Sequence, residues 1–266
     1  MKIDYQETTS DLLTRIDIHQ KYGGRNIDQW MLEVLQVPKG ARILDVGCGA
    51  GKQCFVFHQA LEGQAEIIGG DVNQELLQQA RAEDIQRGTG IKFIDLDFNK
   101  RFPFYDGQFD LVSACFTIYY AEDISLTIRE MHRVLRQGGR LFTSGPMPEN
   151  KRLFYDIIRE ATQKEIPPMP GSSRYGSQIL DAIRALFSSV EVNIFENPLT
   201  FEAVEPFLAY TRASLSEDRR LWKSFFNNKE DFQFIMQQIS AVAERRLQQE
   251  GRLVMTKVVG GFVATK

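Results

Sequence analysis

The sequence predicts an α/β protein with a doubly wound, largely parallel β-sheet. Strand patterns and helix patterns alternate through residues 41–145, and this alternation is typical of βαβ units. The first strand pattern, ILDV from residue 43, runs directly into three closely spaced glycines, Gly47, Gly49 and Gly51. Ligands of such sheets bind at the carboxyl ends of the strands, so this glycine turn marks the expected site.

Each element of the predicted core follows from the local pattern of apolar residues and breakers. Short runs rich in Val, Ile, Leu or Phe indicate buried strands, and longer amphipathic stretches between them indicate helices. The expected strands are residues 42–46, 66–70, 91–96, 109–114 and 140–144. The expected helices between them are residues 52–61, 73–87 and 124–135.

The chain on either side of this core is predicted to be mainly helical. Helices at residues 9–21 and 26–35 are expected to form an N-terminal helical cap within residues 1–40. After the fifth strand we expect a helix at 150–164, a link rich in Pro, Gly and Ser at 166–176, a helix at 178–187 and a strand at 190–195.

A second helical block precedes the last strand pattern. Residues 199–250 are expected to form a helical lid insertion, and residues 253–265 a closing strand with a possible bulge at Gly260-Gly261. The core would then comprise residues 41–198 and 251–266. An insertion at this point of the chain belongs over the carboxyl edge of the sheet, where lids occur.

Composition favours a small molecule as the partner. The formal net charge is −3 and the pI is about 5.8, which argues against a nucleic-acid partner because that binding needs clustered Lys and Arg. Three cysteines, an odd number, indicate free thiols in a reducing cytoplasm, and the few His and Cys residues predict no metal site. Without an apolar leader or membrane-spanning segment, a cytoplasmic location away from membranes is expected, while the oligomeric state stays open.

The spacing of the glycines sorts the possible nucleotide ligands. A dinucleotide fingerprint needs Gly-x-Gly-x-x-Gly, but the third glycine here comes one position early and Lys52 stands in its place. A phosphate-binding Walker loop would need Ser or Thr after Gly-Lys, and the chain has Gln53. The turn still lets bare backbone approach a ligand, and the following helix offers unpaired N–H groups to a polar or anionic group.

Asp71 is the strongest single candidate for a cofactor contact. It ends the second strand pattern 26 residues after Asp45, where a carboxylate can accept hydrogen bonds from both ribose hydroxyls. The alternative is that Asp71 caps the helix that begins near Asn73. Cys48 lies within the turn, where a small residue fits the tight loop. The alternative is that its thiol has a redox or nucleophilic role.

The ordered motifs resemble a class I S-adenosylmethionine-dependent methyltransferase of the small-molecule type, similar to methyltransferase types 11 and 12. They are DVGCGAG, GGDVN, DLDFN, FPFYDGQFDLV and EMHRVLRQGGRL, and the resemblance covers about residues 22–144. Each motif alone is weakly specific, but all of them in this order and spacing are highly specific. The resemblance implies a seven-stranded sheet whose last strand is antiparallel, in agreement with the closing strand pattern.

The resemblance also implies S-adenosylmethionine as the cofactor and assigns residues to its parts. The turn with Gly47, Cys48 and Gly49 would face its methionine portion, and Asp45 would lie near the ammonium group. Asp71 would hold the ribose. The other contacts that the resemblance implies are Val72 on the adenine, Asp97 and Phe98 at the adenine edge with Asp95 as the rival of Asp97, and Cys115 and Phe116 near the sulfonium. Tyr22 is a further candidate because it stands beside two glycines, as in a movable flap, and packing of this segment on the sheet is the alternative.

Tyr119 and Tyr120 are the expected catalytic and acceptor-facing residues. They could orient an acceptor or contact the methyl sulfonium with a ring face, and ordinary packing at a helix entry is the alternative. Tyr210 and Arg212 are further candidates for acceptor contacts, with surface charge as the alternative for Arg212. The expected reaction is methyl transfer to a small metabolite or natural-product intermediate, with oxygen favoured as the acceptor atom.

Three other functions remain open at the level of the sequence. A methyltransferase acting on tRNA or protein should show a face complementary in charge to its substrate. A non-catalytic protein of this fold would keep the glycine turn and bind a partner subunit. A protein using another nucleotide is disfavoured by the missing phosphate fingerprint.

Overall fold

The fold is that of a computed structural model, which describes residues 9–167, 169–215, 222, 225–226 and 228–266. The chain divides into two compact units. Unit 1 contains Met1–Asn26, Pro148–Pro170 and Glu196–Val258, and unit 2 contains Ile27–Met147, Gly171–Phe195 and Val259–Lys266. The predicted division into a cap of residues 1–40, an insertion of residues 199–250 and a core stays a prediction.

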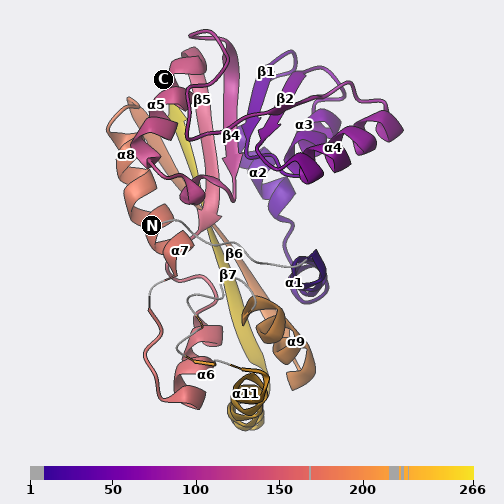
Figure 1. Cartoon of the computed structure of the whole chain (residues 1–266), viewed down its shortest axis with the longest axis vertical. Coiled ribbons are helices and arrows are strands. Elements are labelled where there is room, and N and C mark those ends of the chain that lie inside the picture. Colours follow the sequence, from indigo (N-terminus) through magenta and orange to yellow (C-terminus); the bar gives the residue numbers. More distant parts are fainter. Residues whose placement is uncertain (1–8, 168, 216–221, 223–224, 227) are drawn as a thin grey trace. The chain divides into compact units, whose positions relative to one another are not determined.

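A seven-stranded sheet carries the fold, with strand order β3-β2-β1-β4-β5-β7-β6 (Figure 1). Parallel pairs join β1 to β2 and β4, β2 to β3, and β4 to β5, while β7 is antiparallel to β5. This confirms the expected α/β class and the antiparallel last strand. The strands are β1 (Arg42–Val46), β2 (Glu66–Asp71), β3 (Lys92–Asp95), β4 (Phe109–Cys115), β5 (Leu135–Pro146), β6 (Ser189–Phe201) and β7 (Leu253–Thr265).

Helices cover both faces of the sheet in unit 2 (Figure 1). Successive side chains of β1 alternate between the two faces: Ile43 joins one hydrophobic cluster and Leu44 the other. The Ile43 side is covered by α2 (Ile27–Leu35), α3 (Lys52–Ala60) and α4 (Gln74–Arg87). The Leu44 side is covered by α5 (Ile124–Val134) and by a segment made of α7 (Pro170–Arg174), the π-helical turn η2 (Tyr175–Ile179) and α8 (Leu180–Arg184).

The helical segment from residue 170 corrects the predicted link at 166–176. Proline is tolerated in the first turn of a helix because its missing N–H would have no partner there, so Pro170 does not prevent α7 from forming. Tyr175 then places a fully buried ring in the core of unit 2. Burial of this ring outweighs the local preference of the Gly and Ser residues for a loop.

One predicted strand is present but longer than expected, and one predicted irregularity is absent. The strand expected at 190–195 continues as β6 to Phe201, and Pro198 is exposed on an edge strand, where its missing N–H breaks no ladder. The possible bulge at Gly260-Gly261 is absent, because pairing of β5 with β7 passes through both residues without a register shift. A Cβ on Gly261 would lie 2.7 Å from the Trp30 ring, so these glycines make room for side chains.

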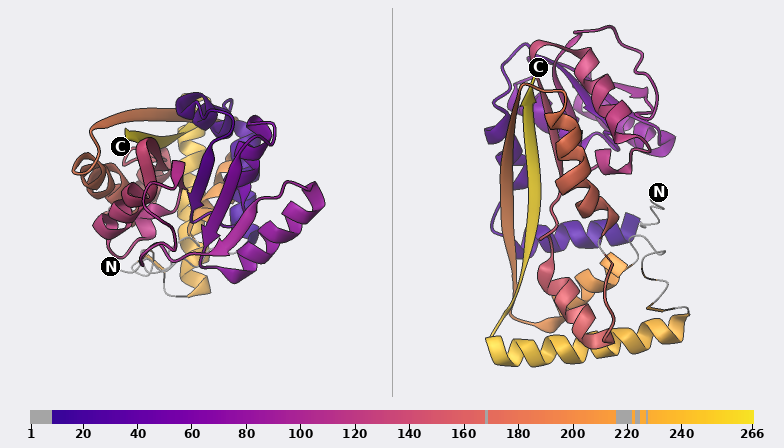
Figure 2. Two further views of the ribbon diagram at one scale, coloured as in Figure 1. Left: turned by 90° about the horizontal axis from the view of Figure 1, so that it is seen from above. Right: turned by 90° about the vertical axis from the view of Figure 1, so that its left-hand side faces the viewer.

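Unit 1 is built around helices from three parts of the chain. α1 (Thr9–Tyr22) packs on α9 (Val204–Leu215), and both α6 (Arg152–Thr162) and α9 pack on the long helix α11 (Lys229–Glu250) (Figure 2). Phe154, Phe207, Tyr210 and Ile239 are among the buried side chains that hold it together. None of the helices in the described part of the chain is long and apolar enough to cross a membrane.

Candidate functional site

The glycine turn connects β1 to α3 and is tied to the neighbouring strand. Gly47, Gly49 and Gly51 have φ angles of 69°, 54° and 82°, in the left-handed region that favours glycine. The N–H groups of Gly47 and Cys48 both donate to the carbonyl of Gly70, at 2.7 and 3.0 Å. These two N–H groups are therefore used internally, and the start of α3, whose N-cap Gly51 has no side chain, offers further backbone N–H groups.

The three glycines meet different surroundings. A Cβ on Gly47 would overlap the side chain of Thr117, and one on Gly51 would lie 2.8 Å from the Phe93 ring. A Cβ on Gly49 would meet only Leu76 Cδ1, at 3.8 Å. Gly47 and Gly51 thus allow close packing behind the turn, whereas Gly49 leaves room beside it. Thr117 was not predicted as part of the site, because no motif marks it.

Asp71 joins the glycine turn to the start of α4. Its Oδ2 accepts a hydrogen bond from the Gly49 N–H at 2.8 Å, and its Oδ1 accepts one from the Asn73 N–H at 2.9 Å. The N-cap of α4 is Asn73, whose side chain accepts from Glu75 and Leu76, so the capping alternative for Asp71 is wrong. Each carboxylate oxygen can accept a further bond. The next residue, Val72, is 54% exposed.

Asp45 lies beneath the turn and is 1% exposed. The Ser113 hydroxyl donates to its Oδ1 at 2.6 Å, and the Cys54 thiol donates to its Oδ2 at 3.5 Å. Burial, opposed by these two bonds and helped by the nearby charge of Asp71, raises the pKa of Asp45 to about 6. Ser113 was missed from the sequence, since it lies 68 residues away and belongs to no motif.

Asp97 and Phe98 follow β3 in a short turn. Asp97 Oδ1 accepts from the Asn99 N–H at 2.9 Å, and Oδ2 lies 3.2 Å from Lys100 Nζ. Burial opposes ionisation, but these two partners together hold the pKa of Asp97 below its usual value. Phe98 is half-buried against the core, and the rival Asp95 is exposed and pairs in register with Asp71.

The chain turns sharply after β4, at Cys115 and Phe116. Phe116 has a φ of 57°, and its N–H donates to the Ser144 carbonyl at 2.8 Å. Burial and the nearby Asp45 carboxylate raise the pKa of the Cys115 thiol well above its usual value, which disfavours a thiolate. Cys48, Cys54 and Cys115 are all free.

A short helical turn, η1 (Ile118–Tyr120), carries the two predicted catalytic tyrosines. Their ring centroids are 4.6 Å apart with the planes inclined by 50°. Tyr119 is 9% exposed, and Tyr120 is partly buried. The structure thus places both tyrosines in unit 2, on the chain that leaves the carboxyl end of β4.

The other predicted site residues belong to unit 1. The Tyr22 ring packs against Phe201 with centroids 5.1 Å apart. Tyr210 is 1% exposed and makes edge contacts with His19 and Phe154, so it belongs to the core of this unit. Arg212 is exposed. Among the described residues, no group of His, Cys, Asp and Glu could hold a metal ion.

The family comparison decides the class of protein. A family model described as "Methyltransferase domain" matches residues 38–181, more than half of the chain. This chain is a methyltransferase of that family. A demethylmenaquinone methyltransferase of Thermus thermophilus is 33% identical over 162 residues, which are 60% of this chain and 70% of that protein.

Further relatives and solved structures agree with this family. A ubiquinone/menaquinone biosynthesis C-methyltransferase of Desulfotalea psychrophila is 28% identical to this chain. The match covers 49% of this chain and 51% of that relative. This chain therefore spans about half the length of that relative. A phosphoethanolamine N-methyltransferase 2 of Haemonchus contortus, in complex with phosphomonomethylethanolamine and S-adenosylhomocysteine, shares the fold. Its TM-score is 0.54 at 16% identity, over 97% of this chain and 57% of that one.

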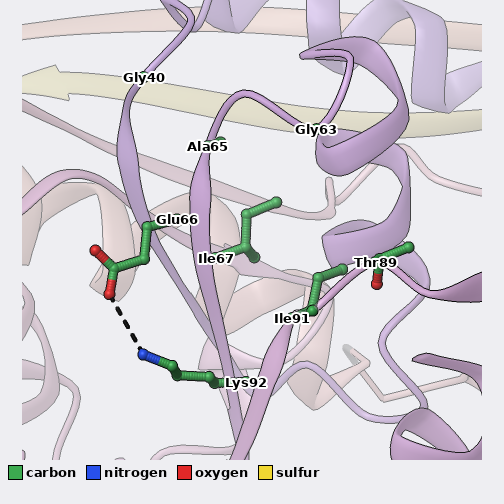
Figure 3. Close-up of a pocket in the computed structure, with 9 residues that line it drawn as sticks. Gly40, Gly63, Ala65, Glu66, Ile67, Thr89, Ile91 and Lys92 are labelled. Atoms are coloured by element: carbon green, nitrogen blue, oxygen red, sulfur yellow. Dashed lines mark ion pairs between the residues drawn. The ribbon is translucent and has the colours of Figure 1, made fainter. Parts of the chain in front are cut away.

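S-adenosylmethionine is the cofactor of this methyltransferase. The residues at the carboxyl ends of the strands suit such a molecule: Gly49 leaves room beside the turn, Asp71 offers a carboxylate, and Val72 exposes an apolar surface. A polar hollow also lies at the opposite, amino-terminal end of these strands, away from the cofactor turn (Figure 3). It is lined by Glu66 and Lys92, the first residues of β2 and β3, which face each other across 3.7 Å.

Proposed function

We propose that this methyltransferase transfers a methyl group to a small hydroxylated aromatic molecule. The observation that carries the proposal is the tyrosine pair, Tyr119 and Tyr120, on the chain that leaves the same strand ends as the cofactor turn. Paired aromatic rings suit a flat aromatic acceptor, which stacks on ring faces. The printed names of relatives, which include demethylmenaquinone methyltransferase and ubiquinone/menaquinone biosynthesis C-methyltransferase, support an acceptor of the quinol type.

The proposed cofactor contacts lie mainly at the carboxyl ends of β1, β2, β3 and β4. Asp71 would accept hydrogen bonds from the ribose hydroxyls while it holds the Gly49 N–H. Asp45 would act from below, by stabilising the turn through Ser113, because its carboxylate is 1% exposed. The remaining proposed contacts are Tyr22, Gly47, Cys48, Val72, Asp97, Phe98, Cys115 and Phe116.

The bound cofactor supplies an activated methyl group on a sulfonium. The chain's own residues then have to align the acceptor in line with that methyl group and exclude water. Tyr119 and Tyr120 would orient the acceptor hydroxyl by hydrogen bonding and hold its ring by stacking. The hydroxyl needs no general base from the protein if it reaches the site already ionised. Transfer to a ring carbon breaks the bond between the methyl group and the sulfonium, leaves S-adenosylhomocysteine, and gives a dienone that returns its ring proton to solvent as the ring regains aromaticity.

The acceptor atom is proposed to be the ring carbon next to the hydroxyl, instead of the oxygen that the sequence favoured. Ionisation of a phenol raises electron density both on the oxygen and on the neighbouring ring carbon, so both atoms are chemically competent. Among the relatives found by sequence, the printed names that state an acceptor atom are those of C-methyltransferases, which favours carbon.

The segment of residues 199–250 is proposed to act as the lid that shields the reaction from water, as its place in the sequence predicts. Its exposed Arg212 is the proposed acceptor contact, while Tyr210 would support that helix by packing with His19 and Phe154. The acidic pI supports a small-molecule acceptor over a nucleic acid. The free cysteines support a cytoplasmic place of action.

The test uses dihydroxynaphthalene as the acceptor and S-adenosylmethionine with a ¹³C-labelled methyl group. Mass spectrometry should find a singly methylated product, and NMR should place the label on carbon. Tyr119→Phe and Tyr120→Phe should lower turnover without changing the affinity for S-adenosylhomocysteine. Tyr105→Phe, which alters a tyrosine 86% exposed, is the matched control.

Two outcomes would count against this function. Wild-type turnover in both tyrosine variants would return Tyr119 and Tyr120 to a packing role. Label transferred to cellular tRNA or protein, with none on dihydroxynaphthalene, would favour the macromolecular methyltransferase instead.

A further inference from the structure

Arg174 connects the end of α7 to the turn that carries the tyrosine pair. Its Nη1 donates to the carbonyl of Tyr119 at 2.6 Å, and its Nη2 donates to the carbonyl of Ala121 at 2.7 Å. The two carbonyls lie on either side of Tyr120. One planar guanidinium therefore holds the backbone at both ends of this residue through two of its N–H donors.

The same helix also contacts the ring of Tyr119. A Cβ built on Gly171 would lie 3.4 Å from two carbon atoms of that ring, so the ring rests against the bare backbone of α7. Arg174 and Gly171 are three residues apart and lie on one face of the helix. Helix α7 thus controls both the main chain and the ring of Tyr119.

The residue after Arg174 anchors this helix to the sheet. The Tyr175 ring is fully buried and stacks on Phe262 of β7, with centroids 4.5 Å apart and planes inclined by 9°. Its hydroxyl forms a 3.0 Å hydrogen bond with the Thr143 hydroxyl of β5. Gly145 makes this possible, since a Cβ there would lie 2.5 Å from the Tyr175 ring.

The π-helical turn η2 begins at Tyr175, directly after Arg174. Such turns break the regular helical register and often occur at functional sites, because they re-aim the side chains around them. Here the turn lets Tyr175 point into the core while the preceding Arg174 reaches the tyrosine turn. The contacts of Tyr175 with β5 and β7 thereby fix the position of the neighbouring Arg174.

No ion pair of Arg174 is found among the described residues, although the acidic residues Glu122, Asp123 and Asp181 line the same surface hollow as Arg174. Partial burial lowers the pKa of its guanidinium. Desolvation of a cation costs free energy, and the two hydrogen bonds to neutral carbonyls offset part of that cost. A role in holding the tyrosine turn at one position accounts for it.

We propose that Arg174 is a positioning residue for methyl transfer, which fixes Tyr119 and Tyr120 against the acceptor. The inference rests on the proposed role of these tyrosines. Arg174 itself touches neither acceptor nor cofactor in this scheme, and it acts through the Tyr119 and Ala121 carbonyls. Loss of Arg174 should therefore misplace the acceptor and leave the cofactor turn intact.

The test compares Arg174→Met, Arg174→Lys and a control, Arg184→Met, at an exposed position of α8 in the same segment. Arg174→Met should lower kcat on dihydroxynaphthalene by up to about 100-fold, since misplacement by about 1 Å costs that much. Arg174→Lys should retain part of the rate. The dissociation constant for S-adenosylhomocysteine should be unchanged in all three. In a protein that already carries Tyr119→Phe, Arg174→Met should lower kcat by a smaller factor than it does in the wild-type protein.

A second measurement does not depend on turnover. In protein with ¹³C-labelled tyrosine rings, the signals of Tyr119 and Tyr120, assigned from the Phe variants, should shift or broaden in Arg174→Met and Arg174→Lys but not in Arg184→Met. Unmoved signals together with wild-type kcat in both Arg174 variants would overturn the inference. Absence of turnover in the wild-type protein would overturn the proposed acceptor, and the ring signals would still decide the role of Arg174.

Discussion

Replacing Asp71 by alanine removes the carboxylate that joins the glycine turn to the start of α4. Two backbone N–H groups, of Gly49 and Asn73, lose their acceptors. A hydrogen bond to a charged group contributes about 1.5–3 kcal/mol, and the lower figure applies to a half-exposed carboxylate. We therefore expect Asp71→Ala to lower the free energy of unfolding by about 3 kcal/mol, even without ligand.

The same change should weaken cofactor binding. Two lost hydrogen bonds to ribose hydroxyls, at about 1.4 kcal/mol each, correspond to a loss of about 100-fold in affinity. S-adenosylhomocysteine at 100 times its wild-type dissociation constant stabilises the wild-type protein by about 2.7 kcal/mol. At that concentration the Asp71→Ala protein should gain only about 0.4 kcal/mol.

Thermal unfolding with and without S-adenosylhomocysteine measures both effects. Asn73→Ala is the matched control, because the Asn73 side chain caps α4 and is not bonded to the glycine turn. Loss of this cap should cost about 1 kcal/mol and leave the ligand-induced shift at its wild-type size. A full ligand-induced shift in Asp71→Ala would refute the assignment of this carboxylate to the cofactor.

Two further predictions concern the glycine turn and the buried acid beneath it. Gly47→Ala should destabilise the protein by about 2–4 kcal/mol in urea unfolding, because it adds a clash with Thr117 to a left-handed backbone. Gly88→Ala, with a φ of 65° and open space around it, should cost only about 1 kcal/mol, and equal losses in the two variants would contradict this reasoning. The pKa of Asp45 rises from 3.8 to about 6 on folding, so the folded state holds this proton more tightly than the unfolded chain. Its contribution to stability is then full below about pH 4 and falls by up to about 3 kcal/mol as the pH rises through 6, and Asp45→Asn should abolish this fall.

Local patterns were sufficient for the core of the fold. The predicted strand at 42–46 and the start of the helix at 52 coincide with β1 and α3, and the other core elements differ by a few residues at their ends. The reason is that alternation and amphipathicity depend on each segment's own burial. The glycine spacing and Asp71 were equally readable, since the turn and the strand end are local features.

Contacts between distant residues were not readable in this way. Ser113 reaches Asp45 across 68 residues, and Arg174 reaches Tyr119 across 55. Neither pair has a local signature. The predicted loop is helical because the Tyr175 ring stacks on Phe262 of β7 and its hydroxyl bonds Thr143 of β5, and these two partners come together only once β5 and β7 have paired.

The sequence by itself determined the family, the cofactor and the order of the strands' motifs, because these rest on short stretches whose residues act together locally. Only the tertiary structure decided which N–H groups of the turn are already bonded, which carboxylate lies below it and which cation holds the tyrosines. The physical reason is that hydrogen-bond partners and burial are set by segments brought together in folding. The glycine turn is the shared case: its sequence predicts a cofactor seat, and its contacts with Gly70, Asp71 and Thr117 give that seat its shape.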